Sequence, residues 1–83
     1  MKTIVITGST RGLGFELAKC FRRQGFNVVI NGVNEKRLES SLAELRSIES
    51  EGAAIGFCGS VTETDNINAM IQKAVTEFGS IDI

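Results

Sequence analysis

A glycine-rich run follows directly on the first apolar stretch of the chain, Ile4-Val5-Ile6. The run consists of Thr7, Gly8, Ser9, Thr10, Arg11, Gly12, Leu13 and Gly14. A turn of this composition between a buried strand and a helix is suited to hold a pyrophosphate, because the helix start offers unpaired N–H groups and a dipole that favours an anion. We therefore expect these residues to form a nucleotide-binding turn.

The three glycines have separate expected tasks in this turn. Gly8 lets the backbone reverse as it leaves the strand, and Gly12 lets a phosphate approach the main chain. Gly14 lets the new helix pack closely on the sheet, and the hydroxyl groups of Ser9 and Thr10 are expected to donate to the phosphate. The spacing Gly-x-x-x-Gly-x-Gly differs from the Gly-x-Gly-x-x-Gly dinucleotide fingerprint, and no Gly-Lys-Ser/Thr follows as it would in a P-loop.

Three strand–helix units are expected to position the turn. Apolar, β-branched stretches predict strands at residues 3–7, 26–31 and 53–58. Strands that alternate with helices predict a parallel sheet with right-handed crossovers. The chain is therefore expected to be one α/β domain over residues 1–83, a truncated βαβαβα Rossmann-type sheet in which Ile81-Asp82-Ile83 begins a fourth strand.

Local signals mark where the helices begin and end. The first helix is expected at residues 12–24, the second between an N-cap at Asn34 and Gly52, and the third between a capping box of Thr62 and Asp65 and a glycine cap at Gly79. Apolar residues recur at helical spacing in each. They are Leu13, Leu17 and Phe21; Leu38, Leu42 and Leu45; and Ile67, Met70, Ile71, Ala74, Val75 and Phe78.

The run from Thr7 to Gly14 matches every fixed position of Thr-Gly-x-x-x-Gly-x-Gly, so the chain resembles the short-chain dehydrogenase/reductase family. The resemblance covers the full chain through the order of its elements and stops just before that family's Asn-Asn-Ala-Gly motif. It implies the N-terminal, NAD(P)-binding half of an oxidoreductase that transfers hydride between nicotinamide and a carbonyl or secondary alcohol.

The resemblance places cofactor choice at the end of the second strand, at Gly32 and Val33. Relatives that prefer NAD carry an Asp near Gly32, and those that prefer NADP often carry an Arg near Val33; this chain has neither. The absence of an acid, together with a basic residue at Arg11, favours NADP(H) over NAD(H). At Ser60 and Val61 the family often has Asp-Val, whose acid bonds the adenine, so Ser60 is expected to contact adenine more weakly.

The family's catalytic Ser, Tyr and Lys lie downstream of the matched segment, and the chain contains no tyrosine. We therefore expect no catalytic residue within these 83 residues and no turnover by the chain alone. A non-catalytic NAD(P)-binding regulatory or interaction module is the alternative. A Rossmann-type domain for another nucleotide, such as a methyltransferase, is disfavoured by the glycine spacing and by the absence of an acid after the second strand.

The charge and composition of the chain limit the partners and the location that are expected for it. The net charge is −1 with acids and bases interspersed, which favours neither nucleic acid nor a membrane surface. The chain shows no signal peptide and no apolar span, so a cytoplasmic location is expected. Cys20 and Cys58 are expected to be buried free thiols. A bare edge of the first strand is expected to make the isolated chain self-associate as a homo-oligomer or require the missing C-terminal half.

Overall fold

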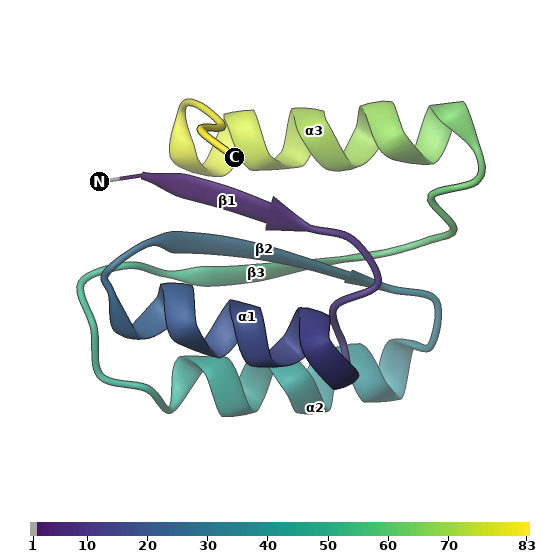
Figure 1. The fold of residues 1–83 in the computed structure, drawn as a ribbon. Coiled ribbons are helices and arrows are strands. Elements are labelled where there is room, and N and C mark those ends of the chain that lie inside the picture. The colour runs from purple at the N-terminus through teal and green to yellow at the C-terminus, as the bar shows by residue number, and fades with distance from the viewer. Residues whose placement is uncertain (1) are drawn as a thin grey trace.

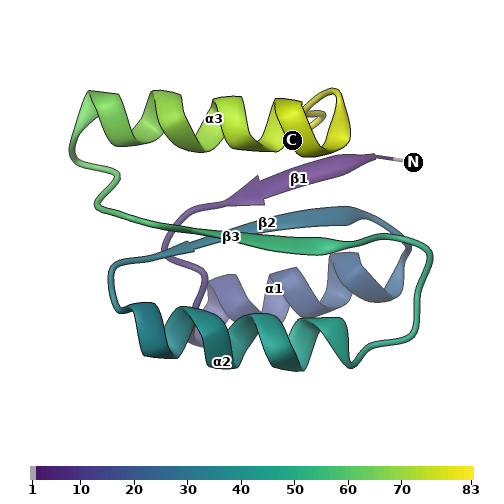
Figure 2. The same ribbon diagram turned by 180° about the vertical axis from the view of Figure 1, so that it is seen from behind.

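The computed structural model describes residues 2–83 and forms an α/β fold of two helical layers around one sheet (Figure 1). The elements in chain order are β1 (Thr3–Ile6), α1 (Gly12–Arg23), β2 (Asn27–Gly32), α2 (Glu35–Arg46), β3 (Ala54–Cys58) and α3 (Thr64–Phe78). The three strands are parallel in the order β1-β2-β3. Helices α1 and α2 cover one face and α3 covers the other (Figures 1 and 2). The predicted Rossmann-type βαβαβα arrangement is confirmed.

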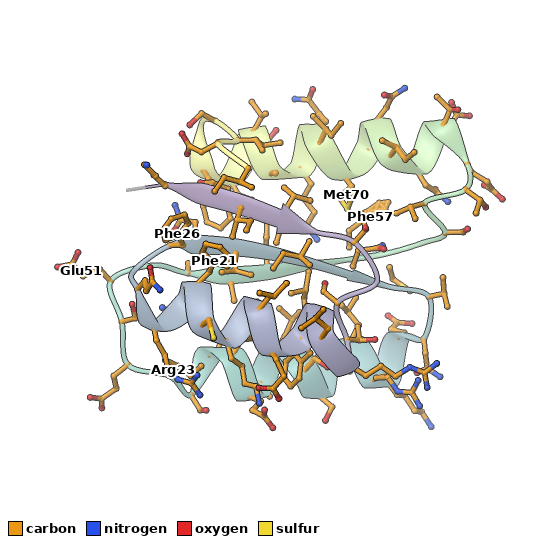
Figure 3. The ribbon with its side chains drawn as sticks, in the orientation of Figure 1. Phe21, Arg23, Phe26, Glu51, Phe57 and Met70 are labelled. Atoms are coloured by element: carbon orange, nitrogen blue, oxygen red, sulfur yellow. The ribbon has the colours of Figure 1, made fainter. Side chains whose placement is uncertain are left out.

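Strand β2 is buried on both faces because helices lie above and below it. Val28 and Ile30 belong to the core cluster beneath α1 and α2, whereas Val29, between them, belongs to the cluster beneath α3. Figure 3 shows Phe57 and Met70 in the second of these layers. This alternation follows from the two-residue period of a strand, and it explains why a continuous apolar run marks a central parallel strand.

Helix α1 buries a different face from the one that its leucines predict. Leu13 is 77% exposed and Leu17 is 43% exposed, while Ala18 and Arg22 are buried. The small side chain of Ala18 allows the helix to approach the sheet, and Phe21 packs edge-on against Phe26 with ring centroids 4.9 Å apart (Figure 3). Of the apolar residues that recur at helical spacing in α1, Phe21 therefore packs on the core, whereas Leu13 and Leu17 do not form its buried face.

Both cysteines are exposed, so the prediction that they are buried is also wrong. Cys20 lies two residues after Ala18, which places it roughly 200° around the helix from the buried face. Cys58 is the last residue of β3, where its Sγ lies 3.7 Å from the carbonyl oxygen of Val33.

The helix ends follow the sequence signals in part. The side chain of Asn34 accepts from the Arg37 N–H at 3.0 Å, and Gly79 has φ 86°, so both predicted caps are confirmed. Helix α3 has Glu63 at its N-cap and no side-chain cap bond, so the predicted capping box of Thr62 and Asp65 is wrong. The Thr62 hydroxyl is instead paired with the Ser60 hydroxyl at 2.7 Å.

The C-terminal residues lie along the free edge of β1 (Figure 1). The Thr3 N–H donates to the Asp82 carboxylate at 2.8 Å, and the Thr3 carbonyl accepts from the N–H of Asp82 at 2.9 Å. The Val5 N–H then donates to the Ile83 carbonyl at 2.8 Å. Residues 82 and 83 thus lie beside β1, where the fourth strand was predicted to begin, but they are not part of a strand in the structure.

Among the described residues, Arg22 is the one whose buried side-chain nitrogens lack hydrogen-bond partners. It is 5% exposed, and its Nε and Nη1 have no hydrogen-bond partner. A buried polar group without a partner lowers stability by its desolvation cost. We expect Arg22→Met, which keeps the length of the apolar stem, to raise the free energy of unfolding by about 1–3 kcal/mol.

Urea denaturation of the native polypeptide that contains residues 1–83 measures this change. Arg23→Met, at an exposed neighbouring position, is the control and is expected to change stability by less than about 0.5 kcal/mol. A loss of stability in Arg22→Met would mean that the guanidinium is well paired in that polypeptide, contrary to the prediction.

Candidate dinucleotide-binding site

The loops that leave the three strands meet at one edge of the sheet. The glycine turn follows β1, residues 33 and 34 follow β2, and residues 59–63 follow β3 (Figure 1). In open parallel sheets, ligands bind outside the carboxyl ends of the strands. This edge is therefore the place where the predicted cofactor residues of all three loops are brought together.

The glycine turn has the backbone geometry expected of it. Gly8 and Gly12 have positive φ angles of 57° and 63°, a conformation that side chains other than glycine rarely adopt. A Cβ on Gly14 would lie 3.0 Å from the Gly8 carbonyl oxygen and 3.1 Å from the Ser9 Cα. The reversal at Gly8 is confirmed. The close packing at Gly14 is against Gly8 and Ser9 of the turn itself, whereas contact with the sheet was predicted. The space that a Cβ on Gly12 would occupy is open.

Asn31, at the end of β2, holds the turn in place. Its Nδ2 donates to the carbonyls of Phe57 at 3.1 Å and Gly59 at 2.9 Å. Its Oδ1 accepts from the Gly8 N–H at 3.4 Å. One buried amide therefore joins the loops after β1 and β3 to the central strand.

The role of Ser9 differs from the one expected. Ser9 is fully buried, and its hydroxyl donates to the Ile6 carbonyl at 2.6 Å and accepts from the Asn31 N–H at 2.9 Å. Its backbone N–H donates to the Asn31 carbonyl at 3.0 Å. Neither donor of Ser9 is left for a phosphate, because both are used to attach the turn to β1 and β2.

The start of α1 retains backbone donors. The N–H groups in the first turn of any helix lack intrahelical acceptors. The N-cap of α1, Arg11, makes no side-chain cap bond to these groups. Thr10, Gly12 and Leu13 flank these groups, which are in position to donate to an anion above the turn.

The ends of β2 and β3 complete the edge. A Cβ on Gly32 would lie 2.5 Å from the Thr10 Cγ2, so β2 and the turn are in close contact there. Val33 is 74% exposed. The Ser60 hydroxyl is paired with Thr62, and the Ser60 carbonyl accepts from Asn66 at 3.0 Å, so these bonds fix the loop that carries Ser60 and Val61.

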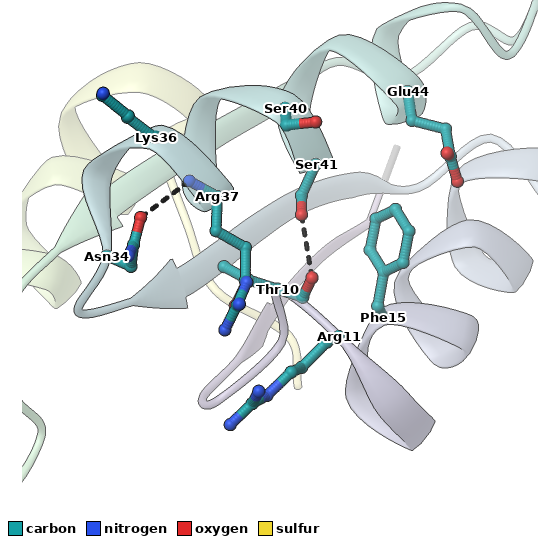
Figure 4. Close-up of a pocket in the computed structure, with 9 residues that line it drawn as sticks. All are labelled: Thr10, Arg11, Phe15, Asn34, Lys36, Arg37, Ser40, Ser41 and Glu44. Atoms are coloured by element: carbon teal, nitrogen blue, oxygen red, sulfur yellow. Dashed lines mark hydrogen bonds between the residues drawn. The ribbon is translucent and has the colours of Figure 1, made fainter.

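A groove of about 510 Å³ lies between the glycine turn and α2 (Figure 4). Its lining residues are Thr10, Arg11, Phe15, Asn34, Lys36, Arg37, Ser40, Ser41 and Glu44. The Ser41 hydroxyl donates to the Thr10 carbonyl at 2.9 Å, which ties α2 to the turn. The sequence analysis assigned no site role to the α2 residues; the available signal was the pair of basic residues, Lys36 and Arg37, in the first turn of α2.

The groove carries more positive than negative charge. Three of its lining residues are basic, and Glu44 is the single acidic one. The Glu44 carboxylate lies 3.6 Å from the Lys19 ammonium, which also contacts Glu16 at 2.9 Å. The hydrogen bond to Glu16, with smaller contributions from the Glu44 charge, raises the pKa of Lys19 above its ordinary value. The end of the groove that carries Arg11, Lys36 and Arg37 suits an anionic ligand, because basic residues outnumber acidic ones there.

No group of three or more His, Cys, Asp or Glu side chains is placed to hold a metal ion within residues 2–83. None of the helices in the same range is long and apolar enough to cross a membrane.

The three parallel strands, with helices on both faces and a glycine turn at their carboxyl edge, have the arrangement of a Rossmann-type fold. The model of the short chain dehydrogenase family matches residues 2–83. This chain therefore belongs to the short-chain dehydrogenase family.

Individual relatives agree with this assignment. The 3-oxoacyl-(acyl-carrier-protein) reductase FabG of Chlamydia muridarum is 36% identical over 83 residues, covering 99% of this chain and 33% of that protein. A diacetyl reductase of Staphylococcus epidermidis is 37% identical over 82 residues, covering 99% of this chain and 31% of that protein. The chain thus spans about a third of the length of the curated relatives it matches.

Solved structures agree on the fold. An alcohol dehydrogenase from Thermococcus sibiricus, complexed with 5-hydroxy-NADP, superposes with a TM-score of 0.88 at 28% identity, covering 99% of this chain and 34% of that one. The apo-form glucose dehydrogenase of Caenorhabditis elegans superposes with a TM-score of 0.90 at 29% identity, covering 98% of this chain and 35% of that one.

Proposed function

We propose that residues 1–83 bind NADP(H), in preference to NAD(H), for an oxidoreductase that acts on a carbonyl or secondary alcohol. The observation that carries this proposal is the glycine turn at the carboxyl edge of the sheet, bordered by a groove with three basic residues and one acid. Several of the relatives are reductases or dehydrogenases, which supports the reaction class.

In this proposal the backbone of the turn binds the pyrophosphate. Gly8, Gly12 and Gly14 set the path of the main chain, and the free N–H groups of the first α1 turn donate to the anion. Thr7, Thr10 and Leu13 line the turn, and the β3 loop at Ser60 and Val61 borders the adenine. The bound cofactor supplies or accepts the hydride.

The residues at the end of β2 support NADP(H). A side chain at Gly32 would require the Thr10 side chain to move, because a Cβ there would lie 2.5 Å from the Thr10 Cγ2. Neither Gly32 nor Val33 supplies an acid that would bond the ribose hydroxyl of NAD and repel a 2′-phosphate. Arg11 adds a guanidinium, which suits a phosphate better than a hydroxyl.

Titration calorimetry of the native polypeptide containing residues 1–83 tests the proposal. We expect NADPH to bind at least about tenfold more tightly than NADH. Gly12→Ala is expected to weaken both by about tenfold or more, because alanine at φ 63° strains the turn and its Cβ occupies space needed by the phosphate.

Gly79→Ala is the matched control, because Gly79 also has a positive φ and open space around it but lies at the far end of α3. It is expected to leave both affinities within about twofold of the parent's. Equal affinity for NADPH and NADH would refute the preference, and binding of neither would refute the function.

We further propose that the protein works in the cytoplasm and that its exposed apolar residues are covered by another copy or by further polypeptide. Two exposed free thiols favour a reducing compartment. Leu13 and Leu17 on α1, and Ile71 and Val75 on α3, are large exposed apolar side chains. Sedimentation of the 83-residue chain as a stable monomer would contradict this second proposal.

A further inference from the structure

Two arginines from different elements line the same end of the groove. Arg11 lies at the N-cap of α1 and Arg37 lies in the first turn of α2. Figure 4 shows their guanidinium groups extending to the same side of the groove, while Lys36 extends away from both. Within residues 2–83, neither arginine takes part in an ion pair; the two ion pairs found there both involve Lys19.

Like charges gathered without a counter-ion repel one another, so their arrangement has to be held by other contacts. The α2 start is fixed by Asn34, which accepts from the Arg37 N–H at 3.0 Å and from the Leu38 N–H at 2.9 Å. The turn that carries Arg11 is tied to α2 by the bond from Ser41 to the Thr10 carbonyl. These bonds fix the relative position of the two backbone segments that carry the guanidinium groups.

The acid of the groove does not neutralise this pair. Glu44 lies at the opposite end of the groove, beyond Phe15, in Figure 4, and its carboxylate is 3.6 Å from Lys19. A guanidinium binds a phosphate through two parallel hydrogen bonds, and two guanidinium groups match the charge of a phosphate monoester dianion. A ribose hydroxyl offers neither charge nor several acceptor oxygens.

We propose that Arg37 is a specificity-determining residue, which together with Arg11 binds the 2′-phosphate of NADP(H). This inference rests on the proposed function and deepens it, because the choice of cofactor then depends on the first turn of α2 as well as on the glycine turn. Arg37 contacts the phosphate directly, and Lys36, its neighbour in the chain, does not.

Calorimetry with cofactor fragments tests this role without any turnover. The probes are adenosine 2′,5′-bisphosphate and adenosine 5′-monophosphate, which differ only in the 2′-phosphate, with NADPH and NADH as the full ligands. The protein is the native polypeptide containing residues 1–83, as the parent, Arg37→Gln and Lys36→Gln. Both replacements remove one positive charge from the same helical turn, and Arg37→Gln retains the backbone N–H that Asn34 caps.

We expect Arg37→Gln to weaken the 2′,5′-bisphosphate and NADPH by about tenfold or more, with the monophosphate and NADH within about twofold. Lys36→Gln is expected to change all four by less than about threefold. Combining Arg11→Gln with Arg37→Gln is expected to bring the affinity for NADPH down to that for NADH.

Two results would overturn the role of Arg37 while leaving the proposed function intact. One is an unchanged affinity ratio of bisphosphate to monophosphate in Arg37→Gln; the other is an equal loss for all four ligands, which would indicate a structural role. If the parent binds neither NADPH nor NADH, the proposed function itself fails, and the inference fails with it.

Discussion

Replacing Gly52 by alanine is expected to lower the free energy of unfolding by about 3 kcal/mol. Gly52 is buried, and a Cβ there would overlap the Phe26 carbonyl oxygen and lie 3.0 Å from the Gly25 carbonyl oxygen. Both are backbone atoms of the turn between α1 and β2, and the Phe26 N–H is itself bonded to the Phe21 carbonyl at 3.1 Å. The obstruction cannot be removed by a change of side-chain rotamer.

The damage is expected to spread to the sheet, since Ala53 is the next residue. Its N–H donates to the Asn27 Oδ1 at 3.0 Å, and its carbonyl accepts from the Val28 N–H at 2.9 Å. Urea denaturation measures the loss. Gly79→Ala is again the control, because it introduces strain at φ 86° without any steric overlap and is expected to cost about 1 kcal/mol. A loss in Gly52→Ala no larger than in Gly79→Ala would contradict the prediction.

Replacing Asn31 by alanine is expected to have a similar cost of about 3 kcal/mol, because buried polar groups lose their partners. Asn31 is 4% exposed. Loss of its amide would leave the carbonyls of Phe57 and Gly59 and the N–H of Gly8 without their side-chain partner. Because Gly8 opens the nucleotide-binding turn, affinity for NADPH is expected to fall together with stability.

Thermal and urea denaturation, with NADPH titration on the folded protein, measure both effects of Asn31→Ala. Asn31→Asp is expected to be at least as damaging, since a carboxylate would face the two carbonyls that now accept from Nδ2. Asn68→Ala, at an exposed position of α3, is the control and is expected to stay within about 0.5 kcal/mol of the parent. An Asn31→Ala variant as stable as this control would show that the amide bonds contribute little.

Much of the fold could be predicted from the sequence because its signals are local. The apolar run at Val28, Val29 and Ile30 marks a strand buried on both faces, and Asn34 and Gly79 mark helix ends. The buried face of α1 could not be predicted in this way. Leu13, Leu17 and Phe21 satisfy the helical period, but so do Ala18 and Arg22, and the approach of the helix to the sheet decides between them.

The features of the candidate site also differ in whether a local sequence pattern predicts them. The tasks of Gly8 and Gly14 depend on backbone geometry within the turn, which the glycine spacing encodes. The bonds of Ser9 to Ile6 and Asn31, and the place of Arg37 on the groove, depend on how separate elements pack. No pattern within one element records such contacts, so they were found only in the structure.

The bonds between Thr3 and Asp82 bear on the order in which the sheet assembles. They join residues 79 positions apart, whereas Thr3 and Asn27 are 24 apart and Asn31 and Phe57 are 26 apart. Closing a longer loop costs more entropy and slows pairing, so β2 is expected to gain both neighbours before β1 gains its second. A nascent chain therefore carries a bare β1 edge until residues 82 and 83 leave the ribosome, and edge-to-edge joining of two copies is most favoured during that interval.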